Sequence, residues 1–411
     1  MRQSIYSKIK QITIDVELLA NSSSNISLFT GISGLPIYYF LDYELTGNKG
    51  NIGRIHSSLE RIILLINTMD GLHYTYCNGI AGIGKIFHFI KEKKILSKSL
   101  NKDIEEALNI IDESIVNISS SPIDDIEEID FLHGAFGLAF YLNDRLPEIT
   151  CNKMIKDVKI FFEKIAQIVL SDIKEGKKLV HITEYNEEDH KTNCGLAHGY
   201  VSYILLFAKF LTHFKKNKLI KEALRKSTEW LLMFESNNSS SFSKYPSIAV
   251  NKNTANYNTS LGWCYGDQTI SLALYKASQV LNDESIKDRA FSLAYNNLKR
   301  DTIEKMFPRP FFDAGFCHGL SSIAYIHKKW HSISGDILFY RQYEKMIFDI
   351  IDFGKDDKGV AGYQKFISVD DGVRDEIGFL DGAIGIGIVL MDYLLGEGNN
   401  TNWDNFFLLD I

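Results

Sequence analysis

The chain has 411 residues, of which 45% are hydrophobic and 24% are charged, proportions that are ordinary for a soluble globular protein. Its net charge of −7 gives no basic footprint, so we expect no nucleic-acid partner. Five cysteines, an odd number in so long a chain, do not suggest a disulfide framework, and the amphipathic N-terminus is unlike a signal peptide. The most apolar stretch, residues 379–395, contains two aspartates and is too short to span a membrane. We therefore expect a cytoplasmic protein without a transmembrane segment, built as two domains or one large closed architecture.

A pair of glycines followed by an apolar run recurs seven times along the chain. The pairs are Gly31/Gly34, Gly79/Gly82, Gly134/Gly137, Gly195/Gly199, Gly262/Gly266, Gly315/Gly319 and Gly382/Gly385. The runs are apolar almost all round, which is typical of a helix buried on every side. Upstream of the pairs, an apolar stripe with a charged face predicts helices at 4–20, 53–69, 104–119, 154–173, 220–236, 284–300 and 338–353. Six prolines and no sustained alternation argue against a β-rich fold.

Seven helical hairpins could stack as an open solenoid or close into a ring. An open solenoid normally ends in polar terminal repeats, but the last repeat, from Gly382, is the most apolar of the seven. We therefore predict an all-α fold, an α/α toroid of seven hairpins with the glycine-rich turns at one rim. It would form a single domain over residues 1–411.

Three of the turns have one more residue between their glycines, and these turns carry the polar chemistry. They contain His198, Cys264, and Cys317 with His318. Equivalent positions of successive hairpins in a ring point to the same central space, so two thiols and an imidazole should meet there. Zinc is bound by cysteine sulfur and histidine nitrogen, and three protein ligands leave a fourth position open for water or substrate. The sequence therefore predicts one zinc ion per chain, held by Cys264, Cys317 and His318, and no other cofactor.

Two further residues are candidates for catalysis. His198 lies directly before the second glycine of its pair, as His318 does. It is therefore either a general acid beside the metal or a histidine whose hydrogen bonds are made within its own turn. Asp130 lies four residues before Gly134 and could accept a hydrogen bond from an imidazole or cap the inner helix. We leave both interpretations open, and the adjacent His133 is equally consistent with a structural role. The other cysteines, Cys77, Cys151 and Cys194, fall outside the glycine register and are expected to be packing or surface thiols.

The chemistry of the predicted site follows from its charge. Two thiolates and a neutral imidazole leave zinc formally uncharged, so it can accept a substrate thiolate and lower the pKa of that thiol from about 8.5. The thiolate is then available as a nucleophile at neutral pH. Its addition to an activated alkene requires an acid that protonates the resulting enolate, and His198 is the candidate for that task.

Taken together, seven glycine-rich hairpins with Ala197-His198-Gly199, Trp263-Cys264-Tyr265-Gly266 and Cys317-His318-Gly319 resemble the lanthionine synthetase C-like family over nearly the whole chain. The resemblance implies an α/α toroid with one zinc on Cys264, Cys317 and His318, and catalytic roles for His198 and Asp130. It also implies a stand-alone lanthipeptide cyclase of the class I type. Such an enzyme adds peptide cysteine thiols to dehydroalanine or dehydrobutyrine, forming lanthionine and methyllanthionine rings.

The resemblance implies partners and contains one departure. The partners are a dehydrated precursor peptide with its leader, a separate dehydratase and an export transporter, in the cytoplasm or in a complex at the inner face of the membrane. Related cyclases often have an arginine four residues before the cysteine of the Trp-Cys-Tyr-Gly motif, where this chain has Ser260. Any role of that arginine is therefore not transferred to this chain.

Three alternatives compete with this prediction. A prenyltransferase-like zinc enzyme also activates a peptide thiol, but that family usually uses Asp, Cys and His ligands and needs a partner subunit. A zinc toroid that binds glutathione or a peptide thiol without turnover would have the same metal ligands. A sugar-processing toroid would need paired carboxylates at the rim, and Asp130 has no evident partner there.

Overall fold

The computed structural model describes residues 2–69, 71–120, 129–175, 192–249, 255–308, 312–356, 358–399 and 401–411. Over these ranges the chain is mostly helical, with four short strands. It forms two compact units, the first made of Met1–Ile111 with Phe311–Phe406 and the second of Asp112–Pro310 with Phe407–Ile411. The single domain expected over residues 1–411 stays a prediction.

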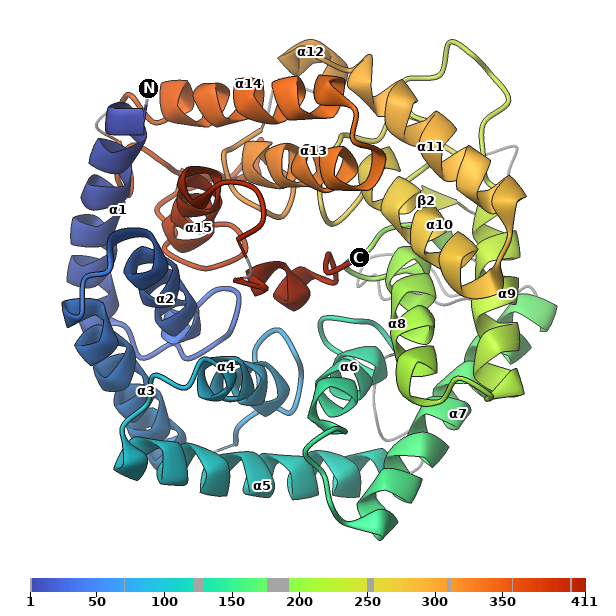
Figure 1. Ribbon diagram of the computed structural model, residues 1–411. Helices are drawn as coiled ribbons and strands as arrows, with labels where there is room; N and C mark the ends of the chain where they lie inside the picture. The colour runs from blue at the N-terminus through green and yellow to red at the C-terminus, as the bar shows by residue number, and fades with distance from the viewer. Residues whose placement is uncertain are drawn as a thin grey trace. The chain divides into compact units, whose positions relative to one another are not determined.

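The seven helices with one polar face form where the sequence predicts them, within a few residues at each end (Figure 1). They are α1 (Arg2–Ser22), α3 (Gly50–Thr68), α5 (Lys98–Ser120), α7 (Asn152–Glu175), α9 (Lys218–Leu232), α11 (Glu284–Leu298) and α14 (Ile337–Phe353). In α9 the buried residues follow a helical stripe that includes Ile220, Leu224 and Leu231. Burial of one stripe leaves the charged face in water, so these are the outer helices.

The apolar runs after the glycines form seven shorter inner helices. They are α2 (Leu35–Thr46), α4 (Ile80–Glu92), α6 (Ala135–Arg145), α8 (Tyr200–His213), α10 (Asp267–Leu281), α13 (Leu320–Ser334) and α15 (Ala383–Leu395). In α15 every residue from Ala383 to Asp392 is buried, which confirms a helix enclosed on all sides. No helix in the described ranges is long and apolar enough to cross a membrane.

Five inner helices, α2, α6, α8, α10 and α13, pack against the outer helix that follows them after a short connection. In the first unit α2 packs on α3 and α13 on α14, and α15 also contacts α1 and α2. In the second unit α8 packs on α9 and α10 on α11, and α7 also contacts α9 (Figure 1). The described residues also form a short α-helix, α12 (Ile303–Met306), and the 3₁₀ helices η1 (Ile32–Gly34) and η3 (Trp403–Phe407).

A glycine is the N-cap residue of each inner helix, and backbone groups satisfy the start of the helix. Glycine has no side chain to cap a helix, and in the turns that end at Gly79, Gly319 and Gly382 the first helical N–H bonds instead to the carbonyl six residues before the glycine. Leu320 N donates to Asp313 O at 3.1 Å, and Ile80 N donates to His73 O at 2.9 Å. A Cβ at Gly319 would lie 2.5 Å from Asp313 O, so this close approach requires glycine. The turn is therefore a seven-residue loop that closes on its own helix.

The N-caps correct the register that the glycine pairs suggest. The N-cap is the first glycine at Gly79, Gly134 and Gly382, but the second glycine in the three turns that contain His198, Cys264 and Cys317. All these turns have the same length, and the first glycine of the wider pairs is an addition upstream. The residue directly before the N-cap is therefore equivalent in these six hairpins. It is Asn78, His133, His198, Tyr265, His318 and Asp381.

The same register changes the prediction for Cys77. Cys77 lies two residues before its N-cap glycine, as Cys264 and Cys317 do, so its expected place outside the register is wrong. Hydrogen bonds between neighbouring turns support the alignment, because Leu28 N donates to Cys77 O at 3.1 Å and Leu196 N donates to Cys264 O at 2.8 Å. Cys77 is nevertheless buried, which agrees with a packing role.

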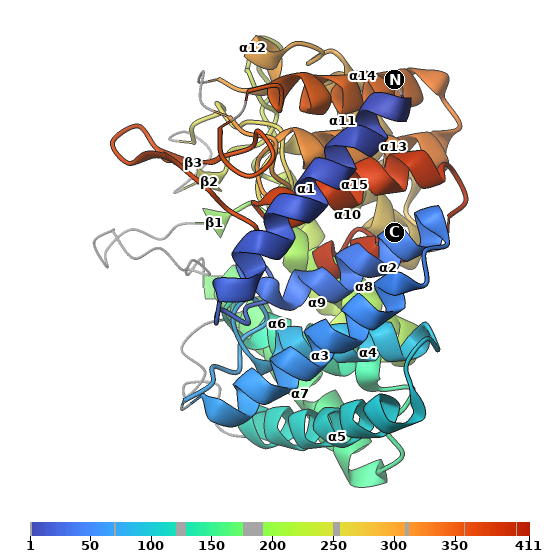
Figure 2. The ribbon, with the colours of Figure 1, turned by 90° about the vertical axis from the view of Figure 1, so that its left-hand side faces the viewer.

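The strands form two small antiparallel pairs. Strand β1 (Thr192–Asn193) pairs with β2 (Ile248–Ala249) in the second unit. In the first unit β3 (Lys365–Ser368) pairs with β4 (Gly372–Arg374), with an irregularity between Phe366 and Ser368. Figure 2 shows this second hairpin projecting away from the helices of its unit.

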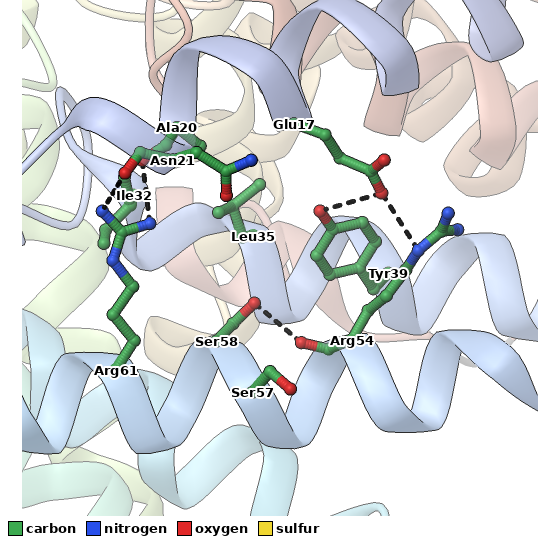
Figure 3. Close-up of a pocket in the computed structure, with 10 residues that line it drawn as sticks. All are labelled: Glu17, Ala20, Asn21, Ile32, Leu35, Tyr39, Arg54, Ser57, Ser58 and Arg61. Carbon is green, nitrogen blue, oxygen red and sulfur yellow. Dashed lines mark hydrogen bonds and ion pairs between the residues drawn. The ribbon is translucent and has the colours of Figure 1, made fainter.

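A hollow between α1, α2 and α3 has a volume of about 300 Å³ (Figure 3). Its polar groups are used within the fold. Arg61 donates to the carbonyls of Ala20 and Asn21 at 2.8 and 3.0 Å, at the end of α1 where helical carbonyls lack partners. Arg54 and Tyr39 both bind Glu17, at 3.0 and 3.3 Å. The hollow is therefore a seam that joins three helices of the first unit.

Asp392 of α15 is the centre of a buried polar network in the first unit, and we expect Asp392→Ala to destabilise the fold strongly. Its carboxylate accepts hydrogen bonds from Lys328 at 2.6 Å and from the Trp403 indole at 3.1 Å, and it is 1% exposed. The variant leaves the Lys328 charge buried without its carboxylate, which costs about 3–5 kcal/mol of unfolding free energy. Urea unfolding measures this loss. The exposed pair of Asp301 with Lys305 is the control, because Asp301→Ala should change stability by less than about 1 kcal/mol; equal losses would contradict the assignment.

Candidate metal centre and proton donor

The turn before α13 carries two of the predicted metal ligands, Cys317 and His318, in the first unit. Asp313 organises this turn: its Oδ1 accepts from Gly315 N at 2.9 Å and its Oδ2 accepts from Phe366 N at 3.1 Å. The same Oδ2 lies 3.7 Å from His318 Nε2. Because Nε2 lies at ion-pair distance from this carboxylate, Nδ1 is the nitrogen of His318 that remains for a metal.

Asp313 was missed by sequence reasoning. The signal for it lies in the register, because the residue six before the N-cap repeatedly accepts from the N–H two residues later. Asn193 does so for Gly195 N at 2.8 Å, as Asp313 does for Gly315. The repeated position therefore identifies a turn-forming residue, which here also reaches the imidazole.

The electrostatic surroundings of His318 favour its protonated form while no metal is bound. Burial alone lowers the pKa of an imidazole, but the neighbouring Cys317 and the carboxylates of Asp313 and Asp381 raise the pKa of His318 to about 10. A metal ion must therefore displace a proton from this ring before the ring can act as a ligand.

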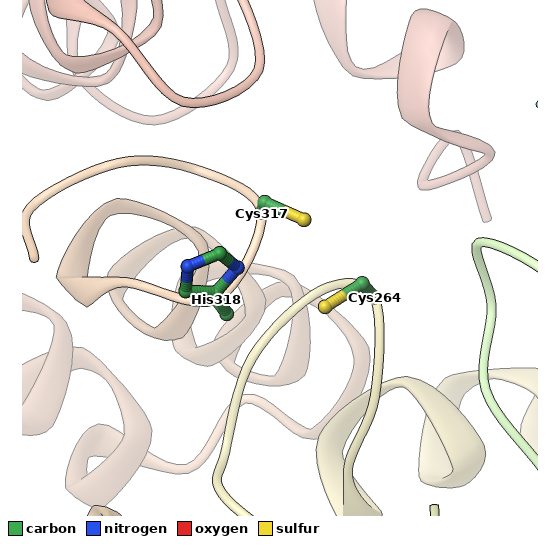
Figure 4. A group of neighbouring side chains, drawn as sticks. All are labelled: Cys264, Cys317 and His318. Atoms are coloured by element: carbon green, nitrogen blue, oxygen red, sulfur yellow. The ribbon is translucent and has the colours of Figure 1, made fainter. Parts of the chain in front are cut away.

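The turn before α10 carries the third predicted ligand, Cys264, in the second unit. Figure 4 draws Cys264 on this turn, and Cys317 and His318 on the turn before α13. Cys264 is 7% exposed, and the fully buried Trp263 beside it donates its indole N–H to Phe407 O at 2.9 Å. Gly266 has a φ of +117°, and a Cβ there would lie 2.4 Å from Ser260 O. The backbone of the turn is therefore held on one side of Cys264 by the Trp263 hydrogen bond and on the other by the close approach at Gly266.

His198 and Asp130, the two predicted catalytic residues, form a hydrogen-bonded pair in the second unit. His198 Nδ1 lies 2.9 Å from Asp130 Oδ2, so Nδ1–H donates to the carboxylate and Nε2 is the nitrogen left for a reacting group. Asp130 is 3% exposed, whereas the His198 side chain is 25% exposed. Burial raises the pKa of a carboxyl group, but hydrogen bonds from His198 and from His133 N outweigh it and hold the pKa of Asp130 below its usual value.

The pairing decides between the two interpretations of Asp130. Its Oδ1 accepts from His133 N, inside the turn, while its Oδ2 accepts from the imidazole. It therefore fixes the tautomer of His198 rather than capping α6, whose N-cap, Gly134, has no side-chain hydrogen bond. The His133 ring stacks on that of His198, with centroids 5.9 Å apart and planes inclined by 15°. Cys194 and Cys151 have the surroundings expected of packing and surface thiols. Cys194 is buried, which raises the pKa of its thiol, and Cys151 is exposed.

Comparisons with known proteins agree with the predicted fold and with the family that the sequence resembles. Residues 22–408 match the sequence profile of the lanthionine synthetase C-like proteins. The solved structure of a nisin cyclase is similar to this chain with a TM-score of 0.73 at 20% identity, over 98% of this chain and 97% of that one. This match confirms the predicted all-α, α/α-toroid fold class. No curated protein sequence matched. Since the profile spans most of the sequence, the chain belongs to the lanthionine synthetase C-like family.

Proposed function

We propose that the chain is a zinc-dependent lanthionine cyclase, which joins cysteine thiols to dehydroalanine or dehydrobutyrine residues within one dehydrated peptide. The observation that carries the proposal is the buried Asp130 carboxylate that orients His198, one hairpin before the Cys264 turn. A thiol-binding protein without turnover has no need of an oriented imidazole. The family and the similar structure, which is named a nisin cyclase, support the same reaction class.

The proposed metal ligands are Cys264, Cys317 and His318. Among the described residues they are the group of three or more histidine, cysteine or acidic side chains that could hold a metal ion. The donor set fits zinc, because two sulfurs and one nitrogen suit this ion and leave a coordination position for substrate. The carboxylate of Asp313, 3.7 Å from His318 Nε2, is placed on the side of the ring where such histidine ligands usually have an acidic neighbour. Bound zinc would lower the pKa of a peptide thiol and present it as a nucleophile.

The chain's own residues then perform the proton transfer. The thiol sulfur forms a bond to Cβ of the dehydroamino acid, and the π electrons move toward the carbonyl to give an enolate. His198 Nε2–H protonates Cα, which completes the addition of S–H across the double bond without another reactant. Asp130 stabilises the imidazolium that donates this proton. The thiol proton lost at the start can return the histidine to its charged form.

The proposal is tested by incubating the purified protein with a dehydrated precursor peptide that contains free cysteines. Ring closure leaves the mass unchanged because no atoms are lost, but it removes free thiols. Alkylation with N-ethylmaleimide followed by mass spectrometry therefore counts the rings formed. Loss of alkylation sites only with the zinc-loaded protein is expected, and full alkylation after long incubation would contradict cyclase activity. The proposal includes a leader-bearing precursor as substrate and a separate dehydratase and an export transporter as partners.

We expect zinc affinity to rise with pH. In the metal-free protein the pKa of His318 is raised to about 10, so the ring is charged throughout the neutral range and must lose its proton to bind zinc. Thiols, with an ordinary pKa of about 8.5, must also lose theirs. Apparent affinity should therefore increase by about tenfold or more per pH unit between pH 6.5 and 8. Competition with a chromophoric chelator measures this slope, and an affinity that does not change with pH would exclude a histidine and thiol ligand set.

A further inference from the structure

Lys365, at the start of β3, lies beside the turn that carries Cys317 and His318. Its Nζ donates to Asp381 Oδ2 at 2.5 Å, and the next residue, Phe366, donates its backbone N–H to Asp313. The β3–β4 hairpin, which projects away from the helices of its unit (Figure 2), is therefore attached at its base to Asp313 of this turn and to Asp381 of the next turn. All of these residues belong to the first unit.

The partner of Lys365 is fixed against the Cys317 turn. Phe316 N and Cys317 N both donate to Leu380 O, at 2.7 and 3.1 Å, and Asp381 is the next residue after Leu380. Gly315 permits this approach, since a Cβ there would lie 2.9 Å from Asp381 O. Asp381 is 7% exposed and occupies the position before the N-cap that His318 occupies in the preceding turn. The Lys365 ammonium is consequently held in one place relative to the thiol.

Lys365 remains charged in this setting. Burial lowers the pKa of an amine, but Asp381, Cys317 and Glu376 together raise the pKa of Lys365 above its ordinary value. The ammonium therefore lies within the electrostatic field of the Cys317 sulfur as well as that of its carboxylate partner.

The charges around the turn explain why a cation is needed. Asp313 and Asp381 are two buried carboxylates, and Cys317 adds a thiolate when it acts as a metal ligand. In the proposed site the two thiolates cancel the charge of the zinc ion, so the thiolate of a substrate brings one further negative charge. A like charge added to a partly buried acidic site is unfavourable unless a cation balances it.

We propose that Lys365 is a positioning residue whose positive charge lets the Cys317–His318 turn accept a substrate thiolate. The inference rests on the proposed function, because it concerns the substrate thiol of that reaction. If Lys365 only held the β3–β4 hairpin, its contribution would depend on its hydrogen bond to Asp381. In the proposed role its contribution depends instead on the net charge around the Cys317–His318 turn. The two roles therefore differ in their response to removal of Asp381.

The test uses the full chain loaded with Co²⁺, whose thiolate charge-transfer absorption reports sulfur binding without catalysis. The neutral probe 2-mercaptoethanol is titrated at one pH. We expect Lys365→Met to weaken thiol binding by about tenfold or more and Lys365→Arg to stay within about threefold of the wild type. The matched control is Lys329→Met, because Lys329 is 17% exposed against 18% for Lys365 and binds Asp404 at 2.8 Å. This control should bind the thiol like the wild type.

A double variant separates charge from anchoring. Asp381→Asn together with Lys365→Met restores the net charge of the turn, so thiol binding should return to within about threefold of the wild type, and Asp381→Asn alone should bind at least as well. If the double variant and Asp381→Asn are both as weak as Lys365→Met, Lys365 only anchors the hairpin and the inference is overturned. Unchanged binding in Lys365→Met overturns it as well. Failure of the wild type to bind cobalt would instead contradict the proposed metal site itself, and the inference with it.

Discussion

Replacing Cys264 or Cys317 with alanine is expected to remove the bound zinc and to slow ring closure by about 10³-fold or more. Either change leaves two protein ligands, too few to retain the ion and to lower the pKa of the substrate thiol. The cysteines lie at the same position of two turns, two residues before the N-cap glycine, so each loss should be equally severe. Elemental analysis after gel filtration gives the metal content, and the alkylation assay gives the rate.

The chain provides a matched control for this prediction. Cys77 occupies the same position of another turn and is buried, as Cys264 is, but it has no role in the proposed site. Cys77→Ala should therefore keep one zinc per chain and the wild-type rate. Full zinc occupancy in both Cys264→Ala and Cys317→Ala, or its loss in Cys77→Ala, would show that the ligands have been assigned wrongly.

His198→Asn is expected to keep the zinc and to slow ring closure by about 10²–10⁴-fold. The imidazole, oriented through the 2.9 Å hydrogen bond from Nδ1–H to Asp130, is the proposed acid that protonates Cα. Asparagine has no group that can give up a proton at neutral pH. Metal content and rate are measured on the same preparation, so that loss of the acid is distinguished from loss of the metal.

Asp130→Asn and a control histidine away from the proposed site complete this experiment. Asp130→Asn should also reduce the rate while zinc is retained, because an amide can no longer hold the Nδ1–H tautomer or stabilise the imidazolium. His331, which lies 3.0 Å from Glu397 in the first unit, is the control, and His331→Asn should react like the wild type. If His198→Asn closes rings at the wild-type rate, another group or water protonates the enolate. If the wild type binds the peptide thiol without closing rings, the chain is a binding protein.

The helices could be predicted from the sequence because each has its own periodicity. The charged face of α9 and the apolar run that begins α15, from Ala383 to Met391, are local patterns, and they distinguish an outer helix with one polar face from an inner helix that is buried all round. The register of the turns could not be obtained from glycine spacing. A glycine is required where the backbone approaches the carbonyl six residues earlier, as at Gly319, and the extra upstream glycines obscured this position.

The candidate site could be predicted where the residue type alone suggests a function. It could not be predicted where the role of a residue depends on which residues pack beside it. Two cysteines and a histidine in repeated turns indicate a metal by residue type alone. The pairing of Asp130 with His198 joins residues 68 positions apart, so the sequence left two interpretations open. Asp313 and Lys365 are ordinary charged residues in sequence, and only the hydrogen bonds between the β3–β4 hairpin and the Cys317 turn reveal them.

X-ray absorption at the zinc edge of the purified protein tests the central claim most directly. The account predicts one zinc per chain with two sulfur ligands at about 2.3 Å and two lighter ligands at about 2.0–2.1 Å, one of them an imidazole. Addition of a cysteine-containing peptide should raise the number of sulfur ligands to three as the exchangeable ligand leaves. A protein without zinc, or a spectrum that does not change when the thiol is added, would contradict a metal that holds a substrate thiol.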